Sequence, residues 1–212
     1  MRISATTILF FVSCLSLSPA QAGGPAKDVV ELFTSQGCSS CPPADAALNT
    51  IINRGGIIAL AWHVDYWDRL GWKDTFSSAA ATARQERYAA RIGGGSYTPE
   101  FVVNGNRGSS SSSIVSGGGL PVAVSVSGGK ATIGAGKGSA SIVLVNYSQA
   151  QTVAIARGEN AGRNITYRHI VTGLRNLGQW NGKAMSISAG SGNCAVILQR
   201  PGQGEIIGAA MC

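Results

Sequence analysis

A serine- and glycine-rich stretch, "NRGSSSSSIVSGGG", divides the chain into two parts with different hydrophobic patterns. Before it, apolar residues recur alternately with the spacing of strands and of helices. After it, they recur only in short alternating runs. A segment of this composition is typical of a flexible linker. The sequence therefore predicts two domains, at residues 23–108 and 120–212, joined by a linker at residues 109–119.

The first part alternates strands and helices. "DVVELFTS" reads as a strand, and "PADAALNTIINRGG" places Ala44, Leu48 and Ile51 on one helical face. "GIIALAWHVDYW" is nearly all apolar, as expected of a parallel strand buried on both faces. "SSAAATARQERYAARIGGG" predicts a second helix, with Ser77 or Ser78 as N-cap and a glycine run at its end, and "EFVVNGN" predicts a strand entering a turn. This order predicts an α/β domain.

The second part reads as an all-β domain of the sandwich type, because short alternating strands follow one another with glycine-rich turns between them. It also holds the excess positive charge. Residues 119–212 carry eight basic side chains against Glu159 and Glu205, whereas residues 23–118 carry eight of each sign. The excess is explained either by solubility or by attraction to an acidic partner in the cell envelope.

The N-terminus has the features of an export signal. Arg2 precedes the apolar run "ILFFVSCLSL", and Ala20 and Ala22 have the spacing that signal peptidase recognises. We therefore expect a signal peptide at residues 1–22 and a secreted or periplasmic protein, which disfavours nucleic acid as a partner. No later segment approaches the roughly 20 apolar residues of a transmembrane helix, so we expect no membrane span.

Four cysteines remain after removal of the signal peptide, an even number in an oxidising compartment, which favours two disulfides. The turn "RPGQG" folds the last two predicted strands together and brings Cys194 close to Cys212. We expect a structural disulfide between them that holds the C-terminus.

The other two cysteines form a C-x-x-C pair, "GCSSC", directly after a strand and before a helix. The helix N-terminus favours thiolate over thiol, so Cys38 is expected to attack and Cys41 to resolve the mixed disulfide. The two prolines after Cys41 weaken this effect, since each removes an amide from the helix start. The expected substrates are protein or small-molecule thiols.

Several motifs together resemble a known family. "ELFTSQGCSSCPPAD", "HVDYWDRLGWKD", "TARQERYA" and "YTPEFVVNG" are similar to a secreted thioredoxin-like family catalogued as domain of unknown function 1223, and "GENAGRNITYRHIV" resembles its second half. The resemblance implies a thioredoxin-like fold for the first domain. It brings no established reaction.

"TPEFVVNG" also resembles a glutaredoxin segment in which a cis-proline lies beside the C-x-x-C pair. The resemblance implies that Pro99 is cis and belongs with the catalytic cysteines, and that the backbone of Thr98 faces Cys38. Tyr97 and Thr98 are then expected to bind substrate.

Further candidates lie in "HVDYWD", at the carboxyl end of the buried strand, the edge where open α/β sheets place their sites. Asp65 and Trp67 are expected to line a substrate groove over Cys38, and His63 is a candidate proton acceptor. Aromatic residues at such positions also serve as lid or core, and strand alternation puts His63 and Asp65 on one face.

Three interpretations of the C-x-x-C pair stay open. The first is an exported thiol-disulfide oxidoreductase, which requires an accessible Cys38. The second is a non-catalytic binding module whose disulfide is structural and which recognises an envelope peptide or glycan. The third, a zinc site, lacks a second C-x-x-C or C-x-x-H, so we expect no metal and, without a phosphate-binding loop, no cofactor. The sequence does not give the direction of electron transfer.

Overall fold

The computed structural model describes residues 24–109 and 118–212. The predicted signal peptide (1–22) and most of the predicted linker (109–119) lie outside this part, and both stay predictions. The described residues form two helices, α1 (Pro42–Asn53) and α2 (Ala79–Ile92), and eleven strands. The strands are β1 (Asp28–Thr34), β2 (Ile57–His63), β3 (Glu100–Val103), β4 (Arg107–Ser109), β5 (Val124–Ser127), β6 (Lys130–Ile133), β7 (Ala140–Ala154), β8 (Asn164–Trp180), β9 (Met185–Ser188), β10 (Cys194–Gln199) and β11 (Ile206–Met211).

The predicted strand-helix order of the first part is confirmed. β1 and β2 are parallel neighbours, and β3 runs antiparallel to β1 on its other side. Apolar clusters join α1 to one face of these strands and α2 to the other, so β2 is buried from its second residue onward. The near-continuous apolar pattern of β2 follows from this two-sided cover.

Helix α2 also begins and ends where its sequence predicts. Ser78 has extended backbone and its side chain accepts a hydrogen bond from the amide of Ala81, which is an N-cap. Gly93 follows the last turn at φ 89°, a conformation that glycine adopts without steric cost. Arg91 lies in that last turn, where its charge complements the helix dipole.

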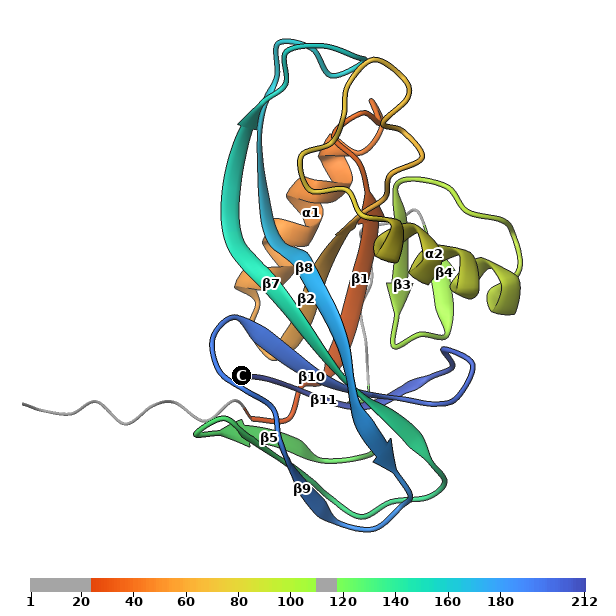
Figure 1. Cartoon of the computed structure of the whole chain (residues 1–212), viewed down its shortest axis with the longest axis vertical. Coiled ribbons are helices and arrows are strands. Elements are labelled where there is room, and N and C mark those ends of the chain that lie inside the picture. Colours follow the sequence, from red (N-terminus) through yellow and green to blue (C-terminus); the bar gives the residue numbers. More distant parts are fainter. Residues whose placement is uncertain (1–23, 110–117) are drawn as a thin grey trace, which may run out of the picture.

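The predicted fold class is wrong. We expected a thioredoxin-like α/β domain followed by a separate all-β domain, but one sheet of eight strands runs through both parts, in the order β11-β10-β7-β8-β2-β1-β3-β4. The chain is mostly β, with only two helices in its described residues. Figure 1 shows the long β7–β8 ribbon running from beside α1 down to the strands of the C-terminal part.

The two parts share one sheet because a strand of the second part, β8, pairs with the open edge of β2. A buried parallel strand with a free edge leaves its backbone hydrogen-bonding groups unpaired. β8 fills that edge, since Ile170 pairs in parallel with Ala61, and its antiparallel pairing with β7 continues far beyond this point. The β7–β8 ribbon therefore joins the strands of the first part to those of the second part in one sheet.

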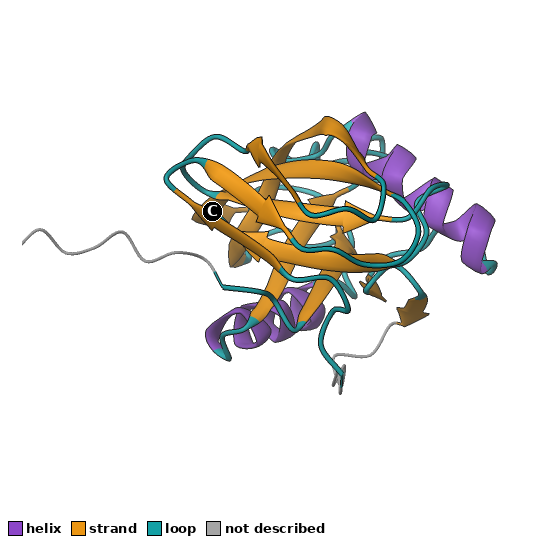
Figure 2. Ribbon diagram, turned by 90° about the horizontal axis from the view of Figure 1, so that it is seen from below, coloured by secondary structure: helices purple, strands orange, loops and turns teal. Residues whose placement is uncertain are grey.

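A smaller sheet of β5, β6 and β9 packs against the C-terminal strands. Its inward residues share an apolar core with β7, β10 and β11 that includes the fully buried Trp180. Figure 2, seen from below, shows these strands stacked in layers, while the helices lie away from them. The alternating strand pattern therefore reflects two packed β layers, and one of these layers is part of the eight-stranded sheet.

The segment that enters β1 also pairs with the end of the chain. Pro25 forms an isolated antiparallel bridge with Ala210, and the amide of Ala26 donates to the carbonyl of Ala209 at 2.9 Å. The first described residues are therefore anchored to β11. Within residues 24–109 and 118–212, neither helix has the length and apolarity needed to cross a membrane.

Candidate functional site

A disulfide joins Cys38 to Cys41 between the end of β1 and the start of α1, with the Cα atoms 5.4 Å apart. Cys41 is the N-cap, and prolines occupy the first two helical positions. The amide of Cys41 donates to the carbonyl of Cys38, and the amide of Ala44 donates to the carbonyl of Cys41. The four N-terminal amide positions of α1 are thus bonded or absent, so the helix dipole remains as its main influence on Cys38.

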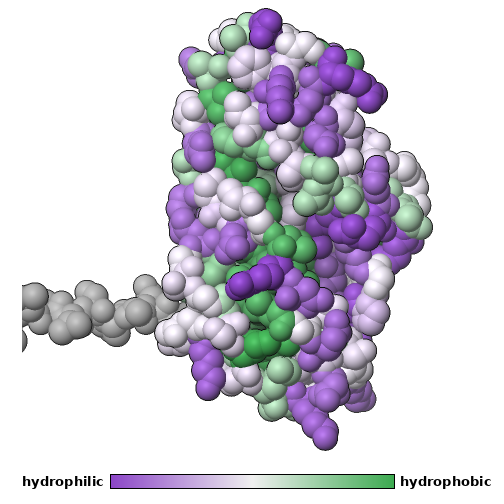
Figure 3. Space-filling view, in the orientation of Figure 1, coloured by the Kyte–Doolittle hydropathy of each residue, from purple (hydrophilic) through white to green (hydrophobic). Residues whose placement is uncertain are grey.

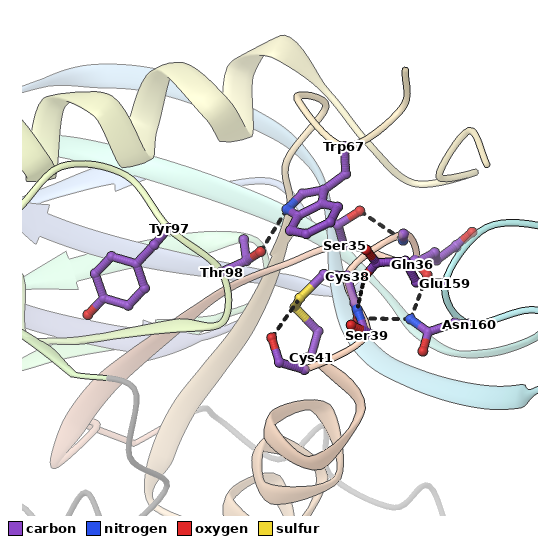
Figure 4. The surroundings of a disulfide bond; sticks show 12 residues. Ser35, Gln36, Cys38, Ser39, Cys41, Trp67, Tyr97, Thr98, Glu159 and Asn160 are labelled. Carbon is purple, nitrogen blue, oxygen red and sulfur yellow. Dashed lines mark hydrogen bonds between the residues drawn. A yellow bond between two sulfur atoms is a disulfide. The ribbon is translucent and has the colours of Figure 1, made fainter. Parts of the chain in front are cut away.

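Both cysteines are fully buried, at 0 % relative exposure. Figure 4 shows Trp67 and Thr98 on one side of the disulfide and α1 on the other. Trp67 donates its indole N–H to the Thr98 hydroxyl at 2.8 Å, while Ser39 and Ser40 between the cysteines are exposed. The disulfide therefore lies directly beneath the surface, and this conformation does not give the access to Cys38 that the redox interpretation requires.

The turn between β7 and β8 holds the segment that contains Cys38. The side-chain amide of Asn160 donates to two backbone carbonyls, of Gln36 at 2.9 Å and of Cys38 at 2.8 Å, and Asn160 is almost fully buried. Beside it, the carboxylate of Glu159 accepts from the amide of Ser39 at 3.2 Å, and the side chain and amide of Ser39 together lower the pKa of Glu159 (Figure 4). A segment some 120 residues away thus fixes the geometry of the C-x-x-C turn.

A buried carboxylate connects this turn to His63. One oxygen of Asp74 accepts from the amide of Gln36 at 2.8 Å and lies 2.7 Å from Nδ1 of His63, and its other oxygen accepts from the amide of Phe76. The His63 ring is 1 % exposed and packs edge-on against Phe76 and Tyr167, with centroids 5.3 and 4.9 Å away. Asp74 therefore orients the imidazole and leaves Nε2 facing the interior.

Asp45 lies in the first turn of α1 and is 3 % exposed. Burial raises the pKa of Asp45 to about 7, against the opposing effect of His63. Within the described residues, five neighbouring buried polar atoms have no hydrogen-bond partner: Thr34 Oγ1, Asp45 Oδ1 and Oδ2, His63 Nε2 and Tyr167 OH. Unpaired buried polar groups are costly and are concentrated at functional sites. Asp45 can hold a proton near neutral pH, one helical turn after Cys41.

The structure brings some of the candidate residues together and separates others. Trp67 and Thr98 lie at the disulfide, and the Thr98–Pro99 peptide bond is cis. Asp65 instead accepts from the Thr82 hydroxyl at 2.6 Å, at the start of α2. Tyr97 is 40 % exposed and its carbonyl accepts from Gln85, away from the cysteines (Figure 4). Asp65 and Tyr97 therefore contact α2 and not the disulfide.

Several residues of the site are not among those predicted from the sequence. Asn160 and Asp74 lie in irregular loops, where no periodic pattern marks them. Asp45 did carry a signal, because it precedes Leu48 by three positions and so belongs to the apolar face of α1. A carboxylate on such a face indicates an unusual environment, since charged side chains are seldom fully buried.

The second disulfide joins Cys194 to Cys212 at one end of the antiparallel β10–β11 pair, where β10 begins and β11 ends, with the Cα atoms 5.1 Å apart. The amide of Cys212 also donates to the carbonyl of Cys194 at 2.7 Å. Elsewhere, the described part of the chain contains no group of three or more His, Cys, Asp or Glu side chains arranged to hold a metal ion.

The chain is similar to a known protein family and to solved structures. Residues 29–199 match the family model described as protein of unknown function (DUF1223). Protein AGR_C_4864 from Agrobacterium tumefaciens has 33% sequence identity to this chain. Its crystal structure matches with a TM-score of 0.75, over 88% of this chain and 93% of that chain. HBP35 of Porphyromonas gingivalis is similar in fold alone, at 13% identity, 89% and 75% coverage and a TM-score of 0.54. None of the curated proteins in the comparison matches.

Proposed function

Because the chain belongs to the DUF1223 family of proteins of unknown function, we propose its function from its own geometry: it is an exported thiol-disulfide oxidoreductase. Its substrates are protein or small-molecule thiols, and its reacting group is the Cys38–Cys41 disulfide. One observation carries this proposal, namely a disulfide directly beneath the surface with a proton-holding carboxyl, Asp45, one helical turn away.

The reaction exchanges one disulfide for another. A substrate thiolate attacks Sγ of Cys38, the Cys38–Cys41 bond breaks, and its electron pair leaves on Sγ of Cys41. Cys41 then takes a proton, which neutral Asp45 supplies. A second substrate thiolate attacks the sulfur joined to Cys38 and releases the substrate as a disulfide and Cys38 as a thiolate. Run in reverse, the reduced pair reduces a substrate disulfide, and ionised Asp45 accepts the proton of the Cys41 thiol.

The disulfide must first be uncovered, because Cys38 is fully buried. Its cover is thin: Trp67 is partly exposed and is held to Thr98 by one side-chain hydrogen bond. Surface segments with few contacts open locally at low free-energy cost. Displacement of the Trp67 ring is therefore the step that admits the substrate thiol.

A purely structural role for the Cys38–Cys41 disulfide would explain fewer features of this site. A disulfide between residues three apart closes a very small loop, which the chain-entropy model values at about 2 kcal/mol. It would also not account for the unpaired atoms of Asp45, His63 and Tyr167, whose burial lowers the stability of the fold.

One observation favours a second candidate function. The complete burial of both cysteines suits a permanently closed disulfide in a non-catalytic module that binds an envelope peptide or glycan. In that case the Trp67 cover would never open, and the cysteines would only fix the turn before α1.

Reactivity of the cysteines separates the two candidates. The mature protein, with this pair reduced, is expected to reduce insulin, and the Cys41→Ser variant to trap mixed disulfides through Cys38. Trp67→Ala is expected to speed reduction of the folded protein's Cys38–Cys41 bond by dithiothreitol, whereas Trp72→Ala, a tryptophan in the same loop that contacts Gln36, serves as the matched control. If no variant traps a thiol partner and uncovering the bond changes nothing, the binding module is the correct function.

The direction of the reaction depends on the equilibrium potential of the pair. A value near about −120 mV would indicate an oxidant, near about −270 mV a reductant, and far below about −300 mV a structural bond. Export itself is tested by the N-terminal sequence of the mature protein, which should begin after Ala22.

A further inference from the structure

A cavity of about 640 Å³ lies between α2, the β7–β8 ribbon and the turn that joins β10 to β11, and neither Cys38 nor Cys41 lines it. Its size is that of a small-ligand site. Its lining combines cationic, polar and apolar side chains: Arg84, Arg87, Ala90, Arg91, Ser141, Val143, Leu174, Asn176, Gln199, Arg200, Gly202 and Gln203. In Figure 3, hydrophobic residues form a band over β7 and β8, and hydrophilic residues border it where α2 lies.

Two of the four arginines of the cavity, Arg87 and Arg91, have no counter-charge among the described residues. Four arginines line it, and no Asp or Glu does. Glu31 neutralises Arg84, and Glu205 lies 3.6 Å from Arg200. All ten acidic residues of the sequence belong to the described part of the chain, and there Arg87 and Arg91 form no ion pair. Arginines four residues apart on a helix repel each other unless an anion lies between them.

Gln203 holds these two arginines in place. Its side-chain oxygen accepts from Nε of Arg87 at 2.8 Å, and its backbone carbonyl accepts from Nε of Arg91 at 3.0 Å. Its amide nitrogen donates to the carbonyl of Arg84. Gln203 does this at φ 54°, in the left-handed region that a non-glycine residue adopts at a cost in energy. Among the described residues, the terminal nitrogens of both guanidinium groups have no hydrogen-bond partner, so they can bind a ligand while already oriented.

The other wall of the cavity, formed by β7 and β8, carries apolar side chains beside Ser141 and Asn176. Leu174 of β8 is 42 % exposed, the most exposed of the large aliphatic side chains of the C-terminal part, and Val143 of β7 lies beside it in the lining. A ligand that reached the arginines would cover this surface as well. The site therefore suits a molecule with an anionic group and an apolar portion, and not inorganic phosphate alone.

Because Gln203 orients Arg87 and Arg91 and these two arginines have no counter-charge, we propose that this cavity binds a small amphiphilic organic anion, a carboxylate or phosphate attached to an apolar chain. The guanidinium groups of Arg87 and Arg91 grip the anionic group, and Leu174 and Val143 pack against the chain. This site is separate from the cysteines, and its occupation does not depend on the proposed redox function.

Calorimetric titration of the full mature protein with dodecyl phosphate, below its micelle concentration, tests the site. Saturable binding is expected, with dodecanoate also bound and the neutral dodecyl maltoside not bound. The Arg87→Gln, Arg91→Gln double variant should lose about tenfold or more in affinity, because charge-assisted hydrogen bonds are lost. Arg54→Gln, which removes an exposed arginine at the end of α1, should bind as the original protein does.

A second variant keeps the test independent of folding. Leu174→Asn leaves the arginines in place, so it should weaken dodecyl phosphate and leave short-chain phosphates unaffected. Equal binding of dodecyl maltoside, equal loss in Arg54→Gln, or a preference for a poly-glutamate peptide over every alkyl anion would overturn the proposal.

Discussion

At the scale of single residues, Asp45 is a carboxyl group that water does not reach, and its protonation ties the stability of the fold to pH. Its pKa is about 7 in the folded protein against an ordinary value of 3.8, so the folded chain keeps a proton that the unfolded chain releases. The stability contributed by neutral Asp45 is therefore complete below about pH 4 and is lost as the pH rises to about 7.

The Asp45→Asn variant is expected to remove this dependence, because asparagine has the same shape and never ionises. At pH 8 the variant should be more stable than the original protein, by up to about 4 kcal/mol, and at pH 4 the two should be similar. Urea unfolding at pH 4, 6 and 8 measures this. Glu86→Gln, at an exposed position on α2, is the control, and an unchanged pH profile in Asp45→Asn would show that this carboxyl is not the group responsible.

A buried ion pair, Arg84 with Glu31, contributes to the stability of the core. Arg84 reaches both oxygens of Glu31, at 2.6 and 3.0 Å, and both side chains are inaccessible to solvent or nearly so. Arg84→Met leaves Glu31 buried without a counter-charge and should cost about 3–5 kcal/mol, whereas Arg84→Met combined with Glu31→Leu should recover most of that. Chemical denaturation gives both values, and a double variant no more stable than the single one would contradict the argument.

At the scale of elements, the sequence predicted those whose pattern is local. Both helices and the buried parallel strands β1 and β2 follow from apolar periodicity, and Ser78 and Gly93 mark the ends of α2. The long strands β7 and β8 lie in a part for which only short strands were predicted, because part of each is solvent-exposed and polar and so resembles a loop. The pairing of β8 with β2 could not be predicted, since no local pattern records which distant strand fills an edge.

The turn between β7 and β8 should control the reactivity of the disulfide. Asn160→Ala leaves the carbonyls of Gln36 and Cys38 buried without their donor, which typically costs about 1–3 kcal/mol. We expect faster reduction of the Cys38–Cys41 bond by dithiothreitol in this variant. Asn181→Ala, in an exposed turn elsewhere, should react at the original rate, and equal rates in both variants would exclude the turn as a restraint.

At the scale of the whole molecule, the C-terminus is fixed by a covalent bond and by its contact with the first described residues. The Cys194–Cys212 bridge closes a loop of 18 residues, for which the chain-entropy model gives about 3 kcal/mol. Replacing both cysteines by serine should lower the melting temperature more than the same change at Cys38 and Cys41, whose loop is far smaller. Calorimetry compares the two variants, and a smaller effect at the C-terminus would contradict the loop-size argument.

The pairing of β2 with β8 also has a kinetic consequence. Ala61 meets Ile170 across roughly 110 residues of sequence, and chains with such distant contacts have a high contact order and fold slowly. The hydrophobic edge of β2 stays open until the ribbon arrives, which makes the newly synthesised chain vulnerable to aggregation and proteolysis. A chaperone that shields this edge during that interval would raise the yield of the folded protein without touching its final stability.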